Sequence, residues 1–153
     1  MRRAGLPHRM RGFVLTGALA TLAATAATTL LAALLRAVGV DFEVSADDEA
    51  VPLGGIAIVT GFFSAVGVLI GAALLRWSTR PAERWVRVAL SLTAISLVPP
   101  LLTEADAATV AALIGLHLVA AAVMILVLSR SLRQRDHGPA RTGTNTPRPS
   151  RVP

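Results

Sequence analysis

The chain has 153 residues, 54% of them hydrophobic, and a formal net charge of +6. A soluble domain is nearer about 45–50% apolar, so the excess indicates membrane-spanning segments. The absence of cysteine excludes thiol catalysis, disulfides, iron–sulfur clusters and thiolate zinc sites.

The first predicted element is an uncharged apolar run over residues 13–35. At a rise of ~1.5 Å per residue such a helix is roughly 35 Å long, enough to cross a hydrocarbon core about 30 Å thick. A cleaved signal peptide is the alternative, because four arginines precede the run and Ala24-Thr25-Ala26 resembles a cleavage site. The run continues past that site and exceeds a signal core of about 7–15 residues, which favours a retained helix.

The connection after it, residues 36–52, is acidic. Its acids are Asp41, Glu43, Asp47, Asp48 and Glu49. They could collect a divalent cation, but their spacing fits no EF-hand, and a solvated external loop is the simpler interpretation. Val40, Phe42 and Val44 alternate with acids, so we expect part of this loop to lie along the membrane surface with its apolar side down.

The second predicted span covers residues 53–75 and is also uncharged. Small residues recur on one face of each of the first two spans. They are Gly17, Thr21, Ala24, Thr25, Thr28 and Ala32 in the first, and Thr60, Ser64, Gly67 and Gly71 in the second. Because lipid tails are as apolar as leucine, membrane helices associate through such close-approach faces. The stripes indicate packing inside a bundle or, alternatively, a dimer face.

The third predicted span, residues 84–102, is the least regular. Arg84 and Arg87 lie at its start, where long side chains can extend toward headgroups. Pro99 and Pro100 remove two helical donors, so with Ser96 they mark a candidate kink followed by an irregular outer end at Leu101 and Leu102.

The connection between the second and third spans carries two tryptophans. Trp77 and Trp85 flank it, and indole rings favour the membrane–water interface. We therefore expect Trp77, Trp85, Arg84 and Arg87 to lie at headgroup level.

The fourth predicted span, residues 107–128, contains one ionisable residue, His117, near its centre. The midpoints of the other spans place Thr25, Ser64 and Thr93 at a similar depth. A buried neutral imidazole has one donor and one acceptor to satisfy, so we expect His117 to face the interior and to bond to hydroxyls of this polar layer.

Several roles remain open for that layer. A packing hydrogen bond is the simplest, and proton or substrate handling is the functional alternative. Haem ligation would need a second histidine at depth, and His8 and His137 lie outside the spans, so a second copy would have to supply it.

Charge predicts the topology. Fourteen of the fifteen arginines fall at the two ends of the chain or in the connection between the second and third spans together with its helix shoulders, and Arg36 is the exception. The positive-inside rule then places both termini in the cytoplasm. Anionic lipid headgroups, not nucleic acid, are the expected partner of these arginines. The basic N-terminus covers residues 1–12, and the Pro-, Gly- and Thr-rich tail, residues 133–153, is predicted to be disordered.

The motifs VGVDFEV (38–44), SLVPPL (96–101) and GLHLVAAAVMI (115–125) resemble the domain of unknown function 6069 family of small four-span bacterial membrane proteins. The resemblance covers about residues 13–132. It implies a four-helix integral protein of the bacterial cell membrane without an established activity. It directs attention to Ser96, Pro99, Pro100 and His117, without assigning any of them a catalytic role.

The predicted fold class is therefore an all-α membrane protein, a bundle of four transmembrane helices. Paired acids, a Ser/His/Asp set and a phosphate loop are missing from the sequence, so we expect no enzyme, cofactor or metal site. Two functions remain: a membrane protein that packs against itself or a partner subunit, and a small oligomeric transporter or channel that uses His117. The lack of carboxylates within the spans favours the first.

Overall fold

The computed structural model describes residues 6–40, 42, 51–102 and 105–136, with the side chains of residues 6–9 and 135–136 left out. Its helices are α1 (Leu6–Ala37), α2 (Leu53–Trp77), α3 (Pro81–Ser96), α4 (Val98–Leu102) and α5 (Ala107–Asp136). The described part of the chain contains no strand. The prediction of an all-α bundle is confirmed.

Four helical segments are long and apolar enough to cross a membrane. They are Met10–Ala37, Leu53–Trp77, Pro81–Leu102 and Ala107–Gln134. This indicates a multi-pass membrane protein and agrees with the number and order of the predicted spans. The first and last helices, α1 and α5, extend past the predicted domain limits at residues 13 and 132. Helical hydrogen bonding continues there through polar residues beyond the apolar run.

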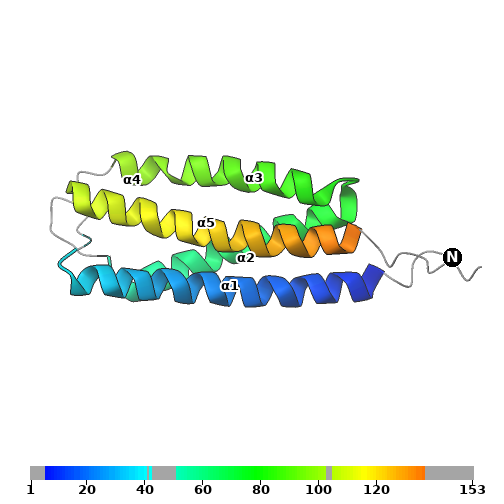
Figure 1. The fold of residues 1–153 in the computed structure, drawn as a ribbon, viewed down its shortest axis with the longest axis horizontal. Coiled ribbons are helices and arrows are strands. Elements are labelled where there is room, and N and C mark those ends of the chain that lie inside the picture. Colours follow the sequence, from blue (N-terminus) through cyan, green and yellow to red (C-terminus); the bar gives the residue numbers. More distant parts are fainter. Residues whose placement is uncertain (1–5, 41, 43–50, 103–104, 137–153) are drawn as a thin grey trace, which may run out of the picture.

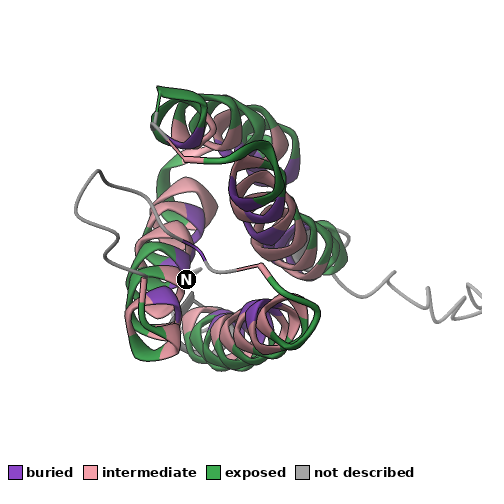
Figure 2. Ribbon diagram, turned by 90° about the vertical axis from the view of Figure 1, so that its left-hand side faces the viewer, coloured by how far each residue is buried: buried purple, intermediate pink, exposed green. Residues whose placement is uncertain are grey.

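The helices form an elongated bundle in which α5 lies between α1 and α3 (Figure 1). α1 packs along α2 and α5, and the described residues of α1 and α3 make no contact. α1 begins and α5 ends at the same end of the bundle (Figure 1). Seen along the axis, the buried residues line the inner faces of the helices and the exposed residues face outward (Figure 2).

Helix boundaries follow local chemistry. Gly39 has φ +96°, the left-handed conformation expected just after a helix. Pro81 occupies the first turn of α3, where its missing N–H is not needed. Asp106 accepts a hydrogen bond from the Thr109 N–H, 3.0 Å away, and so caps α5 by itself.

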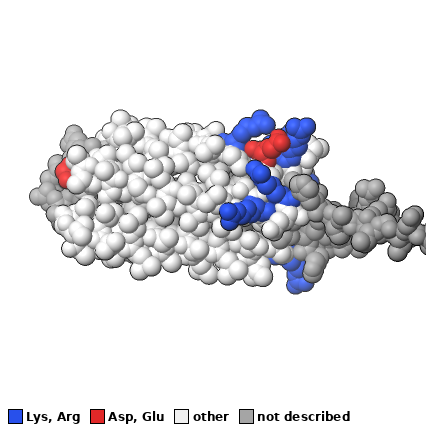
Figure 3. All heavy atoms as spheres, in the orientation of Figure 1, with Lys and Arg blue, Asp and Glu red and all other residues white. Residues whose placement is uncertain are grey.

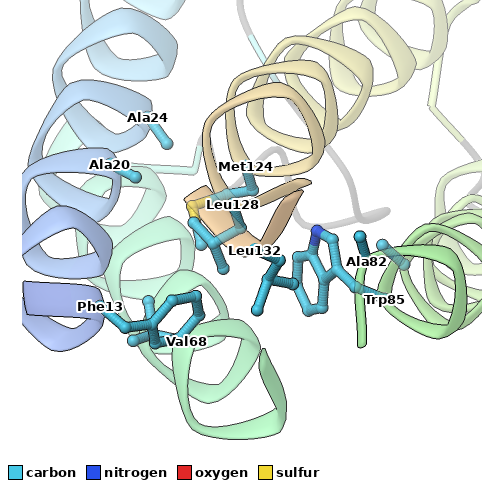
Figure 4. Packing of buried hydrophobic residues seen from close by; sticks show 10 residues of the cluster. Phe13, Ala20, Ala24, Val68, Ala82, Trp85, Met124, Leu128 and Leu132 are labelled. Carbon is cyan, nitrogen blue, oxygen red and sulfur yellow. The ribbon is translucent and has the colours of Figure 1, made fainter. Parts of the chain in front are cut away.

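The core divides into two clusters along the bundle axis. The basic-end cluster consists of Phe13, Ala20, Ala24, Val68, Ala82, Trp85, Ala89, Met124, Leu128 and Leu132 (Figure 4). The acidic-end cluster consists of Ala32, Phe42, Ile56, Ala112 and Leu116. Phe42 is fully buried there, so the expectation that it lies along the membrane surface is wrong. Its ring instead fills space among α1, α2 and α5.

Small residues allow α1, α2 and α5 to approach closely. A Cβ added to Gly17 would lie 2.5 Å from Val68 Cγ1, and one added to Gly71 would lie 2.8 Å from Phe13 Cζ. Neither distance leaves room for a methyl group. The predicted small-residue faces of the first two spans therefore pack inside the bundle.

Candidate functional site

A pair of hydroxyls joins α1 to α2 near the middle of the bundle. Thr28 Oγ1 lies 3.4 Å from Thr60 Oγ1 and 2.9 Å from the Ala24 carbonyl oxygen. The Thr28 hydroxyl has one proton, and the shorter bond shows that it is donated to the Ala24 carbonyl. The Thr60 hydroxyl is therefore the donor to the Thr28 oxygen. Both residues belonged to the predicted stripes, but the sequence did not show that they face each other.

The predicted polar layer is not joined by hydrogen bonds in the described part of the chain. Thr25 and Ser64 lie on the packed α1–α2 side, where a Cβ added to Gly61 would be 3.5 Å from Thr25 Oγ1 and where Ser64 is buried. The Thr93 hydroxyl donates to the Ala89 carbonyl, 2.8 Å away in its own helix. The Thr93 hydroxyl thus satisfies a carbonyl of its own helix and does not reach a neighbouring helix.

His117 is half-buried, and its Nδ1 lies 2.8 Å from the carbonyl oxygen of Leu113. A carbonyl oxygen can only accept, so Nδ1 is the donor in this hydrogen bond. The expected hydrogen bond from the ring to a hydroxyl is replaced by this bond within α5.

The register of the helices shows which residues lie level with His117. A Cβ added to Gly67 would lie 3.5 Å from Met124 Cε, so these two positions face each other across α2 and α5. Thr60 and His117 each lie seven residues earlier on helices that run in the same direction (Figure 1). Seven residues are nearly two turns, so Thr60 and His117 share one level of the bundle, although the Thr60 hydroxyl is directed to Thr28 of α1. Thr60 therefore lies at the level of His117, which the midpoints of the apolar runs did not show.

The candidate kink at Ser96, Pro99 and Pro100 coincides with the break between α3 and α4. Ser96 Oγ donates to the Thr93 carbonyl at 2.8 Å, and the Leu97 N–H bonds to the same oxygen at 3.1 Å. After Leu97 the chain is helical again, so the expectation of an irregular outer end is wrong. The two prolines fall in the first turn of α4, where helical N–H groups have no partner to lose.

The four predicted interface residues differ in their surroundings. Trp77 is 76% exposed with the Arg76 guanidinium 6.0 Å from its ring centroid, and Arg84 is exposed. Arg87 is also exposed and lies 3.9 Å from Glu83. Trp85 is 2% exposed and packs between α3, α5 and Gly67, with no hydrogen-bond partner for its Nε1 (Figure 4). The Trp85 ring therefore packs against other helices, because Gly67 of α2 has no side chain and leaves space for the ring.

Charge is segregated along the bundle. The described arginines of α2, α3 and α5 gather at one end (Figure 3), the end at which α1 begins and α5 ends. At the opposite end Arg36 donates to the Val51 carbonyl, and its guanidinium carbon lies 5.7 Å from the Phe42 ring centroid. The described residues contain no group of three His, Asp or Glu side chains that could hold a metal ion. All five acids of the 36–52 connection, which are the suggested cation ligands, lie outside the described residues.

These features define a four-helix bundle with the length, apolar surface and charge distribution of a multi-pass membrane protein. The chain matches the model of a family of unknown function, DUF6069, over residues 8–134, and it belongs to that family. No curated protein and no solved structure gave a significant match. The resemblance noted from the sequence motifs is confirmed.

Proposed function

We propose that this protein is a non-enzymatic subunit of the bacterial cell membrane that associates with a second copy of itself or with a partner membrane protein. Both termini and the arginine-rich end lie in the cytoplasm, beside anionic headgroups. Support comes from the charge distribution along the bundle and from the many large apolar side chains on its outer surface.

The observation that carries the proposal is the outer face of α5. Ala108, Ala111, Gly115 and Ala122 lie on one side of this helix, and the three alanines are exposed. A Cβ added to Gly115 would meet nothing within 4 Å, whereas Gly17 and Gly71 are in tight contact with other helices. Many exposed side chains elsewhere are large, such as Leu19 and Phe62, and α1 also exposes isolated small residues such as Ala26.

This contrast supports helix association at α5. Small residues let a neighbouring helix approach closely, which gives the van der Waals contact that drives association in lipid. Leucine and phenylalanine faces gain little by exchanging lipid for protein. The small face of α5 is therefore the best-suited surface for a second helix.

Association is tested by replacing Gly115. Gly115→Leu should weaken self-association by about tenfold in lipid vesicles, measured by energy transfer between labelled copies as the protein-to-lipid ratio is varied. The matched control is Ala26→Leu, which adds the same bulk to an exposed small position on α1. Equal self-affinity of both variants and the unmodified chain would contradict a role for this face in self-association. A strictly monomeric chain would leave association with a different membrane protein, which co-purification and mass spectrometry would identify.

A small oligomeric transporter or channel is the second candidate. It is favoured by His117, an ionisable residue that is half-buried near the centre of its span. Vesicles containing a pH-sensitive dye test it directly. His117→Gln should abolish a proton flux that the unmodified chain supports, and the absence of any flux above that of empty vesicles would rule this candidate out for protons.

A further inference from the structure

The basic end of the bundle carries a charged patch that spans two helices. Arginine side chains gather there over both α3 and α5 (Figure 3). The exposed members are Arg80, Glu83, Arg84, Arg87, Arg130 and Arg133. With five arginines and one glutamate, this α3–α5 basic patch has a formal charge of +4.

Packing beneath the patch holds its two helices together at this level. Trp85 of α3 is 2% exposed and belongs to the same buried cluster as Leu128 and Leu132 of α5 (Figure 4). Arginines lie within two residues of Trp85 on α3 and of Leu132 on α5. The charges of both helices therefore share one level of the bundle, on axes that lie about 8–10 Å apart when helices pack.

Glu83 compensates little of this charge. Its Oε2 lies 3.6 Å from Arg80 Nη1 and 3.9 Å from Arg87 Nη2, and the side chains of Glu83, Arg80 and Arg87 are 56%, 76% and 78% exposed. Ion pairs this long and this exposed are weak. Each guanidinium has five N–H donors, so both arginines keep donors for another anion.

Exposed apolar surface begins directly beside the arginines on both helices. Leu90 follows Arg87 by three residues on α3 and is 56% exposed, and Leu126 precedes Arg130 by four residues on α5 and is 53% exposed. Residues three or four apart share one side of a helix, so each leucine adjoins its arginine toward the middle of the bundle. The surface is thus cationic at one level and apolar at the next.

We propose that the α3–α5 basic patch binds a phospholipid whose headgroup contains two phosphodiesters, of the diphosphatidylglycerol class. Guanidiniums of α3 hold one phosphate and those of α5 hold the other, because a guanidinium fork matches two phosphate oxygens. The acyl chains lie along Leu90 and Leu126. Such a site requires the membrane location proposed above but not association through Gly115.

Charge and position favour this lipid over other anions. One phosphate could serve both helices only if their like-charged guanidiniums converged on it, and two phosphates avoid that repulsion. The adjoining leucines place the patch at the border of the hydrocarbon, where lipid headgroups are the abundant anions. A free anion of equal charge would use the arginines and leave the leucines without a role.

Lipid titration followed by native mass spectrometry tests this site. The full chain in an uncharged detergent is titrated with diphosphatidylglycerol. Phosphatidylglycerol with the same acyl chains is the matched control, because it supplies one phosphate. We expect the two-phosphate lipid to bind about tenfold more tightly, the difference that one added charge-assisted contact gives.

Two double variants remove equal charge at this end of the bundle. Arg87→Gln with Arg130→Gln takes one arginine from each helix of the patch and should weaken binding of diphosphatidylglycerol by about tenfold. Arg11→Gln with Arg76→Gln makes the same charge change on α1 and α2 and should weaken binding by less than about twofold, because exposed charges outside the patch are screened. Glu83→Gln should tighten binding, since it removes the competing carboxylate.

Equal affinity for the two lipids, or an equal loss in the two double variants, would overturn the proposal, because the total charge of this end would then explain binding. Displacement of the bound lipid by an equal concentration of inorganic pyrophosphate would assign the patch to a free anion and overturn it as well.

The same titration on Gly115→Leu separates this proposal from self-association. Lipid binding that persists in Gly115→Leu, whether or not the chain associates, would support the lipid site by itself. A chain that associates through α5 but shows no preference for the two-phosphate lipid would reject the lipid site and leave the association face standing.

Discussion

The two ends of the bundle are packed by different means. At the basic end the helices themselves supply the core, with Trp85 of α3 and Phe13 of α1 filling the space beside glycines of α2. At the acidic end the largest buried side chain is Phe42, which comes from a connection between helices. The contrast shows that helix contacts alone close one end of this molecule, whereas the other needs a residue from outside the helices.

Removal of Trp85 should have the largest effect on this contrast. Trp85→Ala leaves a cavity in the basic-end cluster and should lower the free energy of unfolding by about 3–5 kcal/mol. Trp85→Phe should cost below ~1 kcal/mol, because it keeps most of the ring and removes an N–H that has no partner. Unfolding by sodium dodecyl sulfate in mixed micelles measures both. Trp77→Ala is the control at an exposed indole, and a cost equal to that of Trp85→Ala would contradict the packing described.

Adding bulk between α1 and α2 should have the next largest effect. Gly17→Val places atoms where Val68 already lies and should destabilise the bundle by about 1–3 kcal/mol. Gly115→Val makes the same change where nothing lies within 4 Å. The same micelle assay compares them. If both substitutions lower the free energy of unfolding equally, helix propensity and not the close approach of α1 and α2 would explain the lost stability.

The acidic end has a conformational test of its own at Phe42, whose φ is +57°. Phe42→Ala and Phe42→Gly both remove the ring, but only glycine adopts this φ without strain. We therefore expect Phe42→Gly to be about 1 kcal/mol more stable than Phe42→Ala. The reverse order in the micelle assay would mean that the backbone relaxes once the ring is gone.

Acid should produce the smallest effect, at the cap of α5. The Thr109 side chain and then its backbone N–H bond to Asp106 and hold the pKa of that carboxyl below its ordinary value. A lowered folded pKa means that this stabilisation is fully present above the unfolded pKa, near ~3.9, and is lost as pH falls through the folded value. The unfolding midpoint of the unmodified chain should thus drop more below about pH 4 than that of Asp106→Asn, which keeps a capping oxygen. Parallel acid profiles would show that the charge contributes nothing.

The long apolar runs and the recurring small residues of the sequence predicted the helices well. The starts of α2 at Leu53 and α5 at Ala107 agree with the predicted spans, because an apolar run must be helical in hydrocarbon. The small residues of α1 and α2 were also correctly recognised as close-packing positions. Composition and spacing are sufficient for such features, because each depends on a single helix and its solvent.

Contacts between helices were harder to predict. The headgroup level of Trp85 stays a prediction, but the sequence did not show that its ring packs inside the protein beside Gly67. His117 was expected to bond to hydroxyls, but its own helix offers the Leu113 carbonyl. Phe42 was expected at the surface, and nothing in its local pattern reveals the space among three helices. Each outcome depends on the register between helices, which one sequence does not display.

The backbone bond from the Val51 N–H to the Phe42 carbonyl, 3.1 Å long, has a practical use. This bond holds Phe42 and Val51 close together, so residues inserted between positions 43 and 50 should displace neither α1 nor α2. A short epitope inserted there should leave the bundle intact and, in whole cells, be reached by antibody without permeabilisation. The same position would then report directly on which side of the bilayer each end of the molecule faces.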